Sequence, residues 1–308
     1  MDGEIVIDVK GLTKIYGDKK VVDDFDLKVP RGAVYGFLGP NGSGKTTTIR
    51  MVCGLLLPNA GEGTCLGWDV ITQSEEIKKK VGYMTQKFSL WEDLTIRENL
   101  EFVARMYEMD DQKRRVDDAL DELGLRGREK QLAGSLSGGW KQRLALSACL
   151  MHDPDLLLLD EPTAGVDPKA RREFWDTIHE VADRGVTILV STHYMDEAVQ
   201  CDYIAYIAYG KKLIDAPSGE LVDQVGLHTW RVEGKGLAAL TKNLEAVEGI
   251  EHIARFGTAL HISGLDKDAL KNAVSPYFDE PNLSWEKRKP GLEEVFIHLM
   301  SGSEDNFK

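Results

Sequence analysis

The sequence predicts an α/β fold built on a mostly parallel, helix-covered sheet. Short apolar runs that resemble buried strands alternate with helical patterns as far as Pro217. A run of helical patterns between Phe88 and Met151 interrupts this alternation and indicates an inserted helical lobe. Past Gly226 the order changes to strand, helix, strand, strand, helix, strand, which fits a small ferredoxin-like α+β domain.

The N-terminal part begins with strand-forming sequence. Three runs rich in β-branched and aromatic residues lie at 4–9, 21–29 and 33–39. The third run leads into a helix predicted from Gly44 to Cys53, so a strand, a loop and a helix follow one another directly. A further short strand is predicted within 79–85.

Two helices are predicted within the helical lobe. The first spans 95–107, and its apolar side chains recur with helical spacing on one face, namely Ile96, Leu100, Val103 and Tyr107. The second runs from Arg114 to Leu123 and ends at Gly124, because glycine readily adopts the backbone conformation that follows a helix.

Three apolar runs predict the centre of the sheet, at 155–160, 186–192 and 203–208. The first is a continuous apolar run, typical of a parallel strand buried on both faces. Between the first two runs, Asp167 is expected to cap a helix that has Pro168 at its first position and ends before Gly185.

The C-terminal part is predicted as a separate set of elements. Its strands are expected at 229–232, 250–255, 259–262 and 283–287, and its helices at 237–247 and 267–277. A final amphipathic helix follows in "GLEEVFIHLM".

Composition narrows the class of protein. The 308 residues are 42% hydrophobic and 29% charged, values that are ordinary for a globular protein. The net charge of −13 disfavours nucleic acid as a partner, because a nucleic-acid-binding surface has to be basic. The four cysteines show no CxxC spacing, so buried free thiols are expected at Cys53, Cys65, Cys149 and Cys201.

No membrane segment or targeting signal is expected. No apolar run approaches the roughly 18 residues that cross a bilayer. The N-terminal "MDGEIVIDVK" is acidic and lacks the basic and then apolar pattern of a signal peptide. We therefore expect a cytoplasmic protein that does not span a membrane by itself.

The segment "GPNGSGKTT" matches the phosphate-binding P-loop pattern G-x-x-x-x-G-K-[ST] between a predicted strand and a predicted helix. Consecutive backbone N–H groups of such a loop surround the β-phosphate, Lys45 reaches the β- and γ-oxygens, and the Thr46 hydroxyl ligates Mg²⁺. The sequence thus predicts a nucleoside triphosphate site formed by Gly39, Pro40, Asn41, Gly42, Ser43, Gly44, Lys45, Thr46 and Thr47.

Two adjacent acids follow the apolar run "LLLL". A carboxylate at the C-terminal end of a buried strand lies beside the P-loop in such folds, so Asp160 is predicted to hold Mg²⁺. Glu161 follows at once and is placed to orient or deprotonate the water that attacks the γ-phosphate.

A second anion cradle is predicted at "SLSGGWKQR". Ser137, Gly138 and Gly139 precede a helical run, and the N–H groups at a helix start attract anions. One chain therefore carries two phosphate cradles almost a hundred residues apart.

The motif set resembles the ATP-binding-cassette (ABC) family over about residues 5–215. The resemblance implies a P-loop ATPase fold with a mixed or parallel core sheet, an antiparallel β subdomain and an inserted helical lobe. It also implies that two ATPase subunits face each other, so that the P-loop of one and the "LSGG" of the other hold the same ATP. The two cradles are then explained by a homodimer or by pairing with a related subunit.

The resemblance assigns further residues. Tyr16 resembles the aromatic residue that stacks on adenine, and Gln86 the glutamine that touches Mg²⁺ or the attacking water. Asp167 resembles the loop that crosses the dimer interface, and His193 the histidine that contacts the γ-phosphate. Ser137 and Gly139 would contact the γ-phosphate bound by the partner.

One residue departs from the family pattern. Trp140 stands where the signature usually has glutamine, while the serine and both glycines remain. ATP turnover is expected to survive this change. The indole is expected to alter contact with the partner subunit or with neighbouring helices.

The C-terminal part resembles that of drug- and ion-exporter ATPases of the ABC-2 type, whose permease is a separate chain. This implies an ATPase subunit that powers export of a small solute and lies on the cytoplasmic face of the membrane through its permease. The permease is expected to dock on the lobe near Phe88, Leu90 and Trp91. An importer ATPase remains the alternative, with a non-transport ABC ATPase as a third class.

The predicted domains are an ATPase domain at 4–218, with its helical lobe at about 87–152, and a C-terminal accessory domain at 226–302. The accessory domain could serve regulation, dimerisation or both.

Overall fold

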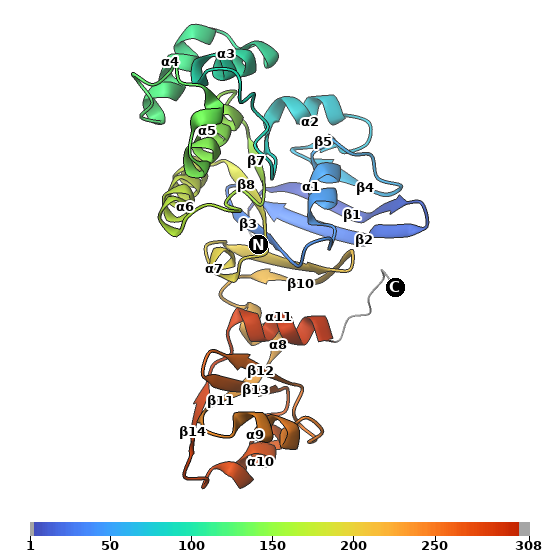
Figure 1. Cartoon of the computed structure of the whole chain (residues 1–308). Coiled ribbons are helices and arrows are strands. Elements are labelled where there is room, and N and C mark those ends of the chain that lie inside the picture. The colour runs from blue at the N-terminus through green and yellow to red at the C-terminus, as the bar shows by residue number, and fades with distance from the viewer. Residues whose placement is uncertain (1–2, 302–308) are drawn as a thin grey trace. The chain divides into compact units, whose positions relative to one another are not determined.

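The computed structural model describes residues 3–301 of the chain. These residues form two compact units, one that ends at Asp215 and one that begins at Ala216. Figure 1 shows the first unit in blue to yellow and the second in orange to red. The first unit has two sheets and the second has one, and each unit has its own cluster of buried apolar side chains.

The larger sheet of the first unit has six strands: β3 (Val34–Leu38), β6 (Val81–Met84), β7 (Leu156–Asp160), β8 (Thr187–Thr192), β9 (Tyr203–Ala208) and β10 (Lys211–Pro217). Their order is β10-β9-β3-β8-β7-β6. The pairs that connect β9 through to β6 are all parallel, so the predicted mostly parallel sheet is confirmed. Parallel strands end at one edge, which brings together the residues that follow β3, β7 and β8.

A second, antiparallel sheet of the first unit comprises β1 (Ile5–Tyr16), β2 (Lys19–Pro30), β4 (Ala60–Cys65) and β5 (Trp68–Asp69). The strand order is β2-β1-β4-β5. Strand β4 was not predicted, because "AGEGTC" lacks apolar alternation. Its glycines allow a close approach to β1: a Cβ on Gly63 would lie 2.3 Å from the carbonyl oxygen of Asp8.

The helices of this unit outside the lobe are α1 (Lys45–Val52), α2 (Ser74–Lys80), α6 (Pro168–Asp183) and α7 (Met195–Ala198). Helix α1 contacts β1 and β2 of the smaller sheet as well as β7 and β8 of the larger one. One apolar cluster accordingly joins side chains such as Phe25, Phe37 and Ile49. At the start of α6, the Asp167 carboxylate accepts hydrogen bonds from two backbone N–H groups, which confirms the predicted cap.

The helical lobe contains α3 (Ile96–Met106), α4 (Gln112–Glu122), a 3₁₀ turn at Ala133–Ser135 and α5 (Gly138–Leu150). Thr95 and Glu98 form a reciprocal capping box at the start of α3. Ile96, Leu100 and Val103 are buried in the lobe's apolar cluster, as their spacing predicts. The lobe thus has a core of its own.

The second unit contains four strands: β11 (His228–Gly234), β12 (His252–Phe256), β13 (Ala259–Gly264) and β14 (Leu283–Arg288). Their order is β12-β13-β11-β14, and each neighbouring pair is antiparallel. The helices are α8 (Leu221–Val225), α9 (Leu237–Leu244), α10 (Lys267–Val274) and α11 (Leu292–Ser301), with a 3₁₀ turn at Ser275–Tyr277.

Several elements differ from the sequence predictions. β5, β10, α2, α7 and α8 were not predicted, and most of them are short. Helix α10 ends at Val274 rather than at Tyr277, because Pro276 has no N–H to continue the ladder. All four cysteines are free, but Cys149 is only partly buried. Within residues 3–301 no helix is long and apolar enough to cross a membrane.

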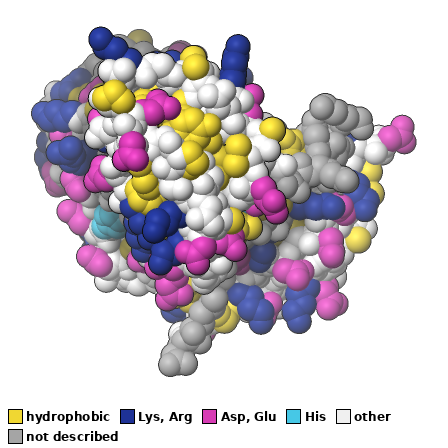
Figure 2. Space-filling model, turned by 90° about the horizontal axis from the view of Figure 1, so that it is seen from below, with side chains coloured by type: hydrophobic (Ala, Val, Ile, Leu, Met, Phe, Trp, Pro, Cys, Tyr) yellow, Lys and Arg dark blue, Asp and Glu magenta, His cyan; other side chains and the backbone are white. Residues whose placement is uncertain are grey.

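The surface carries charges of both signs. On the face seen in Figure 2, acidic side chains lie beside basic ones, with hydrophobic side chains between them. The mixture agrees with the net charge of −13, which comes from 51 acidic and 38 basic residues.

Candidate functional site: the edge where β3, β7 and β8 end

The loop after β3 is shaped by glycine. Gly39 has φ 155°, and a Cβ there would lie 2.0 Å from the Ile207 carbonyl oxygen, so the loop tolerates no side chain at this position. Gly44 adopts the left-handed conformation with φ 103° and begins α1 without any side-chain cap. The N–H groups of the first turn of α1 are therefore left to an incoming anion.

Lys45 is buried under this loop with 4% of its side chain exposed. Its ammonium donates to the carbonyl oxygens of Gly39 at 2.7 Å and Pro40 at 3.1 Å. It also lies 3.6 Å from Oε1 of Glu161. Burial lowers the pKa of Lys45, while the carboxylates of Glu161 and Asp160 oppose that shift. The site therefore holds a buried cation between backbone carbonyls and a carboxylate.

Asp160 ends β7 beside the first turn of α1. Its Oδ1 accepts a hydrogen bond from the Thr46 hydroxyl at 2.9 Å and another from Ser191 at 2.6 Å. A carboxylate and a hydroxyl in contact form the oxygen-rich set that Mg²⁺ prefers. Ser191, on β8, was missed by the sequence analysis because only the pairing of β7 with β8 brings it here.

Glu161 is the centre of the constellation. Its backbone has φ 47°, and its N–H donates to the carbonyl and hydroxyl oxygens of Ser191, both at 3.0 Å. Its Oε2 accepts from the Gln86 amide at 2.9 Å and lies 3.4 Å from Nδ1 of His193. The structure thus brings together Lys45, Gln86, Glu161 and His193, four residues that the sequence analysis chose separately.

The surroundings of the P-loop fit a polyphosphate. A cavity of about 330 Å³ is lined by residues 41–47 together with Val21, Gln86 and Glu161. Within the described part of the chain, the buried hydroxyl of Ser43 has no hydrogen-bond partner. An unpaired donor beside the uncapped start of α1 suits an anion with several acceptor oxygens.

Other predicted residues lie outside this cavity. Tyr16 is 51% exposed at the end of β1, and the Lys14 ammonium lies 5.4 Å from its ring centroid. Ser137 and Gly138 form the start of α5, again without a side-chain cap. A Cβ on Gly139 would lie 2.9 Å from Cβ of Ala170, so α5 approaches the start of α6 closely there.

Trp140 contacts two arginines. The guanidinium carbons of Arg128 and Arg143 lie 5.4 and 5.2 Å from its ring centroid, within cation–π range. Arg143 in addition pairs with Glu173 of α6 at 3.7 Å. The indole therefore contacts one arginine of its own helix, α5, and one of the segment between α4 and α5.

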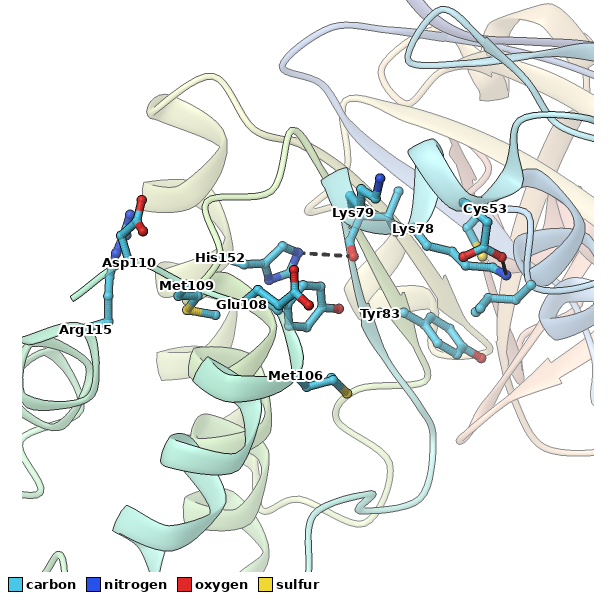
Figure 3. A pocket seen from close by; sticks show the side chains of 14 residues that line it. Cys53, Lys78, Lys79, Tyr83, Met106, Glu108, Met109, Asp110, Arg115 and His152 are labelled. Atoms are coloured by element: carbon cyan, nitrogen blue, oxygen red, sulfur yellow. Dashed lines mark hydrogen bonds and ion pairs between the residues drawn. The ribbon is translucent and has the colours of Figure 1, made fainter. Parts of the chain in front are cut away.

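A larger cleft of about 890 Å³ lies elsewhere in the first unit, where α3, α4 and the residues after α5 meet α2, β6 and the residues after α1. Figure 3 shows Met106 extending from the lobe toward the side on which Tyr83 lies. The His152 ring stacks on Tyr107 at 3.8 Å, and burial lowers its pKa to about 4. His152 is therefore neutral at pH 7.

The predicted docking residues do not line this cleft. Phe88 and Leu90 pack against the lobe's apolar cluster, and Trp91 lies against Phe102 with ring centroids 4.3 Å apart. Leu55 and Met106 in the cleft are 45% and 58% exposed, and Trp91 outside it is 43% exposed.

The sequence and the fold are similar to those of known proteins of one family. The model of the ABC transporter family matches residues 22–164, which include the P-loop, Ser137 and the Asp160–Glu161 pair. The chain is 37% identical to the Nod factor export ATP-binding protein I of Burkholderia orbicola, over 95% of the chain and 96% of that protein. The chain belongs to the ABC transporter family. Its recognition as an ABC ATPase and the predicted α/β P-loop fold are thereby confirmed.

Two further relatives extend the comparison. The chain is 44% identical over 72% of its length to the probable multidrug ABC transporter ATP-binding protein YbhF of Escherichia coli, but it spans only 39% of that protein. A solved ATP-binding cassette, a dimer bound to ADP and Pi, superposes with a TM-score of 0.63 at 26% identity, covering 69% of this chain and 98% of the other.

Proposed function

We propose that the chain is the ATP-hydrolysing subunit of an exporter whose permease is a separate protein. The observation that carries the proposal is that the Glu161 carboxylate has a polar atom of each of Lys45, Gln86 and His193 within 4 Å. Similarity to ATPases named for Nod factor export and for a probable multidrug transporter supports export.

Each residue has a distinct role in the proposed reaction. Lys45 and the N–H groups at the start of α1 bind the β- and γ-phosphates of ATP. Glu161 orients the attacking water and accepts its proton, and His193 and Gln86 hold the Glu161 carboxylate in place. Thr46 and Asp160 would hold Mg²⁺ together with Gln86, and the ion would neutralise charge on the phosphate oxygens.

We further propose that ATP joins two subunits. Ser137 starts α5 outside the P-loop cavity of its own subunit, so its free helix start is available to the nucleotide of a facing subunit. Asp167, at the start of α6, would lie at the same interface. The partner subunit is a second copy of this chain or a related ATPase, and Tyr16 would stack on the adenine.

The permease is proposed to dock in the 890 Å³ cleft and thereby to hold the chain at the cytoplasmic face of the membrane. The exposed Leu55 and Met106 offer apolar contacts, and the rim carries charges of both signs, from Lys78, Lys79, Glu108 and Asp110. An amphipathic helix fits such a groove.

We keep the ferredoxin-like accessory domain at 226–302 as a proposal. Its last residue, 302, lies outside the residues that the structure describes.

The substitution Met106→Glu tests docking separately from catalysis. A carboxylate at the apolar contact should weaken co-purification with the permease at least ~10-fold, a loss typical of a central contact residue. The isolated subunit should hydrolyse ATP at the parent rate, because Met106 lies outside the P-loop cavity. Pull-down of a tagged permease co-expressed with the chain, together with phosphate release, measures both effects.

A matched control uses Val199→Glu, since Val199 is 60% exposed but lies outside the cleft. Equal loss of the permease in both variants would contradict docking in the cleft. Co-purification with an import permease instead would favour the importer alternative.

A further inference from the structure

A buried carboxylate lies next to the proposed catalytic residues without touching the P-loop cavity. Glu197 is on α7, four residues after His193, and only 1% of it is exposed. Its Oε2 accepts a hydrogen bond from the Thr192 hydroxyl at 2.6 Å, and its Oε1 accepts another from Thr163. The Arg171 guanidinium forms an ion pair with Oε1 at 3.5 Å. Separating a buried carboxylate from its partners is costly, so Glu197 holds the side chains that contact its two oxygens firmly in place.

One arm of this network reaches the backbone around His193. The Thr192 hydroxyl donates a hydrogen bond to Glu197, and its oxygen accepts one from the N–H of Tyr194 at 3.0 Å. The residues before and after His193 are therefore linked through a single hydroxyl. Glu197 determines which way that hydroxyl points.

A second arm reaches the ring of His193. The Arg171 guanidinium lies 4.3 Å from the ring centroid of Tyr194, and the Tyr194 ring lies 4.1 Å from that of His193. Arg171 is held by Glu197 on one side and by Asp196 at 3.2 Å on the other. The stack restricts the imidazole that faces Glu161.

The third arm reaches the strand end that carries Glu161. Thr163 is two residues beyond Glu161 and is itself buried. Glu197 thus connects the segment after β7, which carries Glu161, with the segment after β8, which carries His193. These two residues lie 3.4 Å apart.

We propose that Glu197 is a positioning residue for ATP hydrolysis, which fixes His193 against Glu161 through Thr192, Arg171 and Thr163. The inference rests on the proposed ATPase function. It assigns Glu197 no contact with nucleotide.

Glu197→Gln tests the inference with little change in shape. The amide has one acceptor oxygen instead of two and no charge for Arg171, so it cannot accept from Thr192 and Thr163 on separate oxygens as the carboxylate does. A loosened catalytic contact should lower kcat by ~10- to 100-fold, while KM for ATP stays within about twofold. Glu180→Gln is the matched control, because Glu180 is an exposed acid on α6 that has no part in the network described above. Its kcat should stay close to that of the parent.

Thr192→Val and Thr192→Ser extend the test to variants that keep Glu197. Valine removes the linking hydroxyl and should lower kcat like Glu197→Gln, whereas serine retains it and should restore turnover. Combining Glu197→Gln with His193→Ala should cost no more than His193→Ala alone, because residues that act through one another are not additive.

Parent-like kcat in Glu197→Gln, or losses that multiply in the double variant, would overturn the positioning role. So would a loss confined to KM. If the parent chain releases no phosphate from ATP, the proposed function itself fails. If the parent is active and Glu197→Gln is equally active, only the positioning role fails.

Discussion

Glu161→Gln is expected to abolish ATP turnover while leaving ATP binding intact. The amide is nearly isosteric, and its oxygen can still accept the hydrogen bond from Gln86. It cannot accept a proton from water, and loss of a general base typically costs about 10²–10⁴ in rate. Phosphate release measures turnover, and a fluorescent ATP analogue measures binding.

The same variant should also form an ATP-dependent dimer. Removing the charge 3.6 Å from Lys45 lowers the repulsion felt by the γ-phosphate, which favours two subunits closing around two ATP molecules. Sizing in ATP and Mg²⁺ should therefore show a shift from monomer to dimer. Glu180→Gln, an exposed acid on α6, serves as the control. Hydrolysis at the parent rate by Glu161→Gln would exclude Glu161 as the base.

Lys45→Ala should fail at the earlier step. The buried ammonium is the cation nearest the P-loop carbonyls of Gly39 and Pro40, and a charged hydrogen bond is worth about 1.5–3 kcal/mol. The Kd for ATP should therefore rise at least ~10-fold, and no ATP-dependent dimer should appear on sizing.

Lys169→Ala provides the comparison, because Lys169 on α6 has a side chain that is 87% exposed. ATP affinity in that variant should match the parent. Lys45→Ala with the parent Kd would mean that the triphosphate lies elsewhere.

The P-loop and the acidic pair could be predicted because each occupies a short, contiguous segment. The pattern at residues 39–46 fixes its own backbone shape, and the apolar run before Asp160 indicates a buried strand. Parallel pairing then places both at one edge, so their meeting follows from fold class alone.

The supporting residues could not be predicted, because they are defined by contacts across the sheet. Ser191 reaches Asp160 only through the register of β7 and β8, and Glu197 meets Thr163 across 34 residues of sequence. Neither shows a motif of its own. Docking at Phe88, Leu90 and Trp91 stays a prediction: the first two side chains pack against the lobe's apolar cluster, whereas Trp91 is 43% exposed.

The central claim is that the cradle at Ser137 serves the ATP bound by a facing subunit. Mixing Lys45→Ala subunits with Ser137→Arg subunits tests it most directly. In a dimer of either variant alone, both ATP sites are damaged, because each site needs the P-loop of one subunit and Ser137 of the other. A mixed dimer joins the intact P-loop of one variant with the intact Ser137 cradle of the other. Each mixed dimer has one intact site of two, so the account predicts ATPase activity that neither variant shows alone, up to about half of the parent rate. A mixture that pairs on sizing but stays as inactive as either variant would contradict the account.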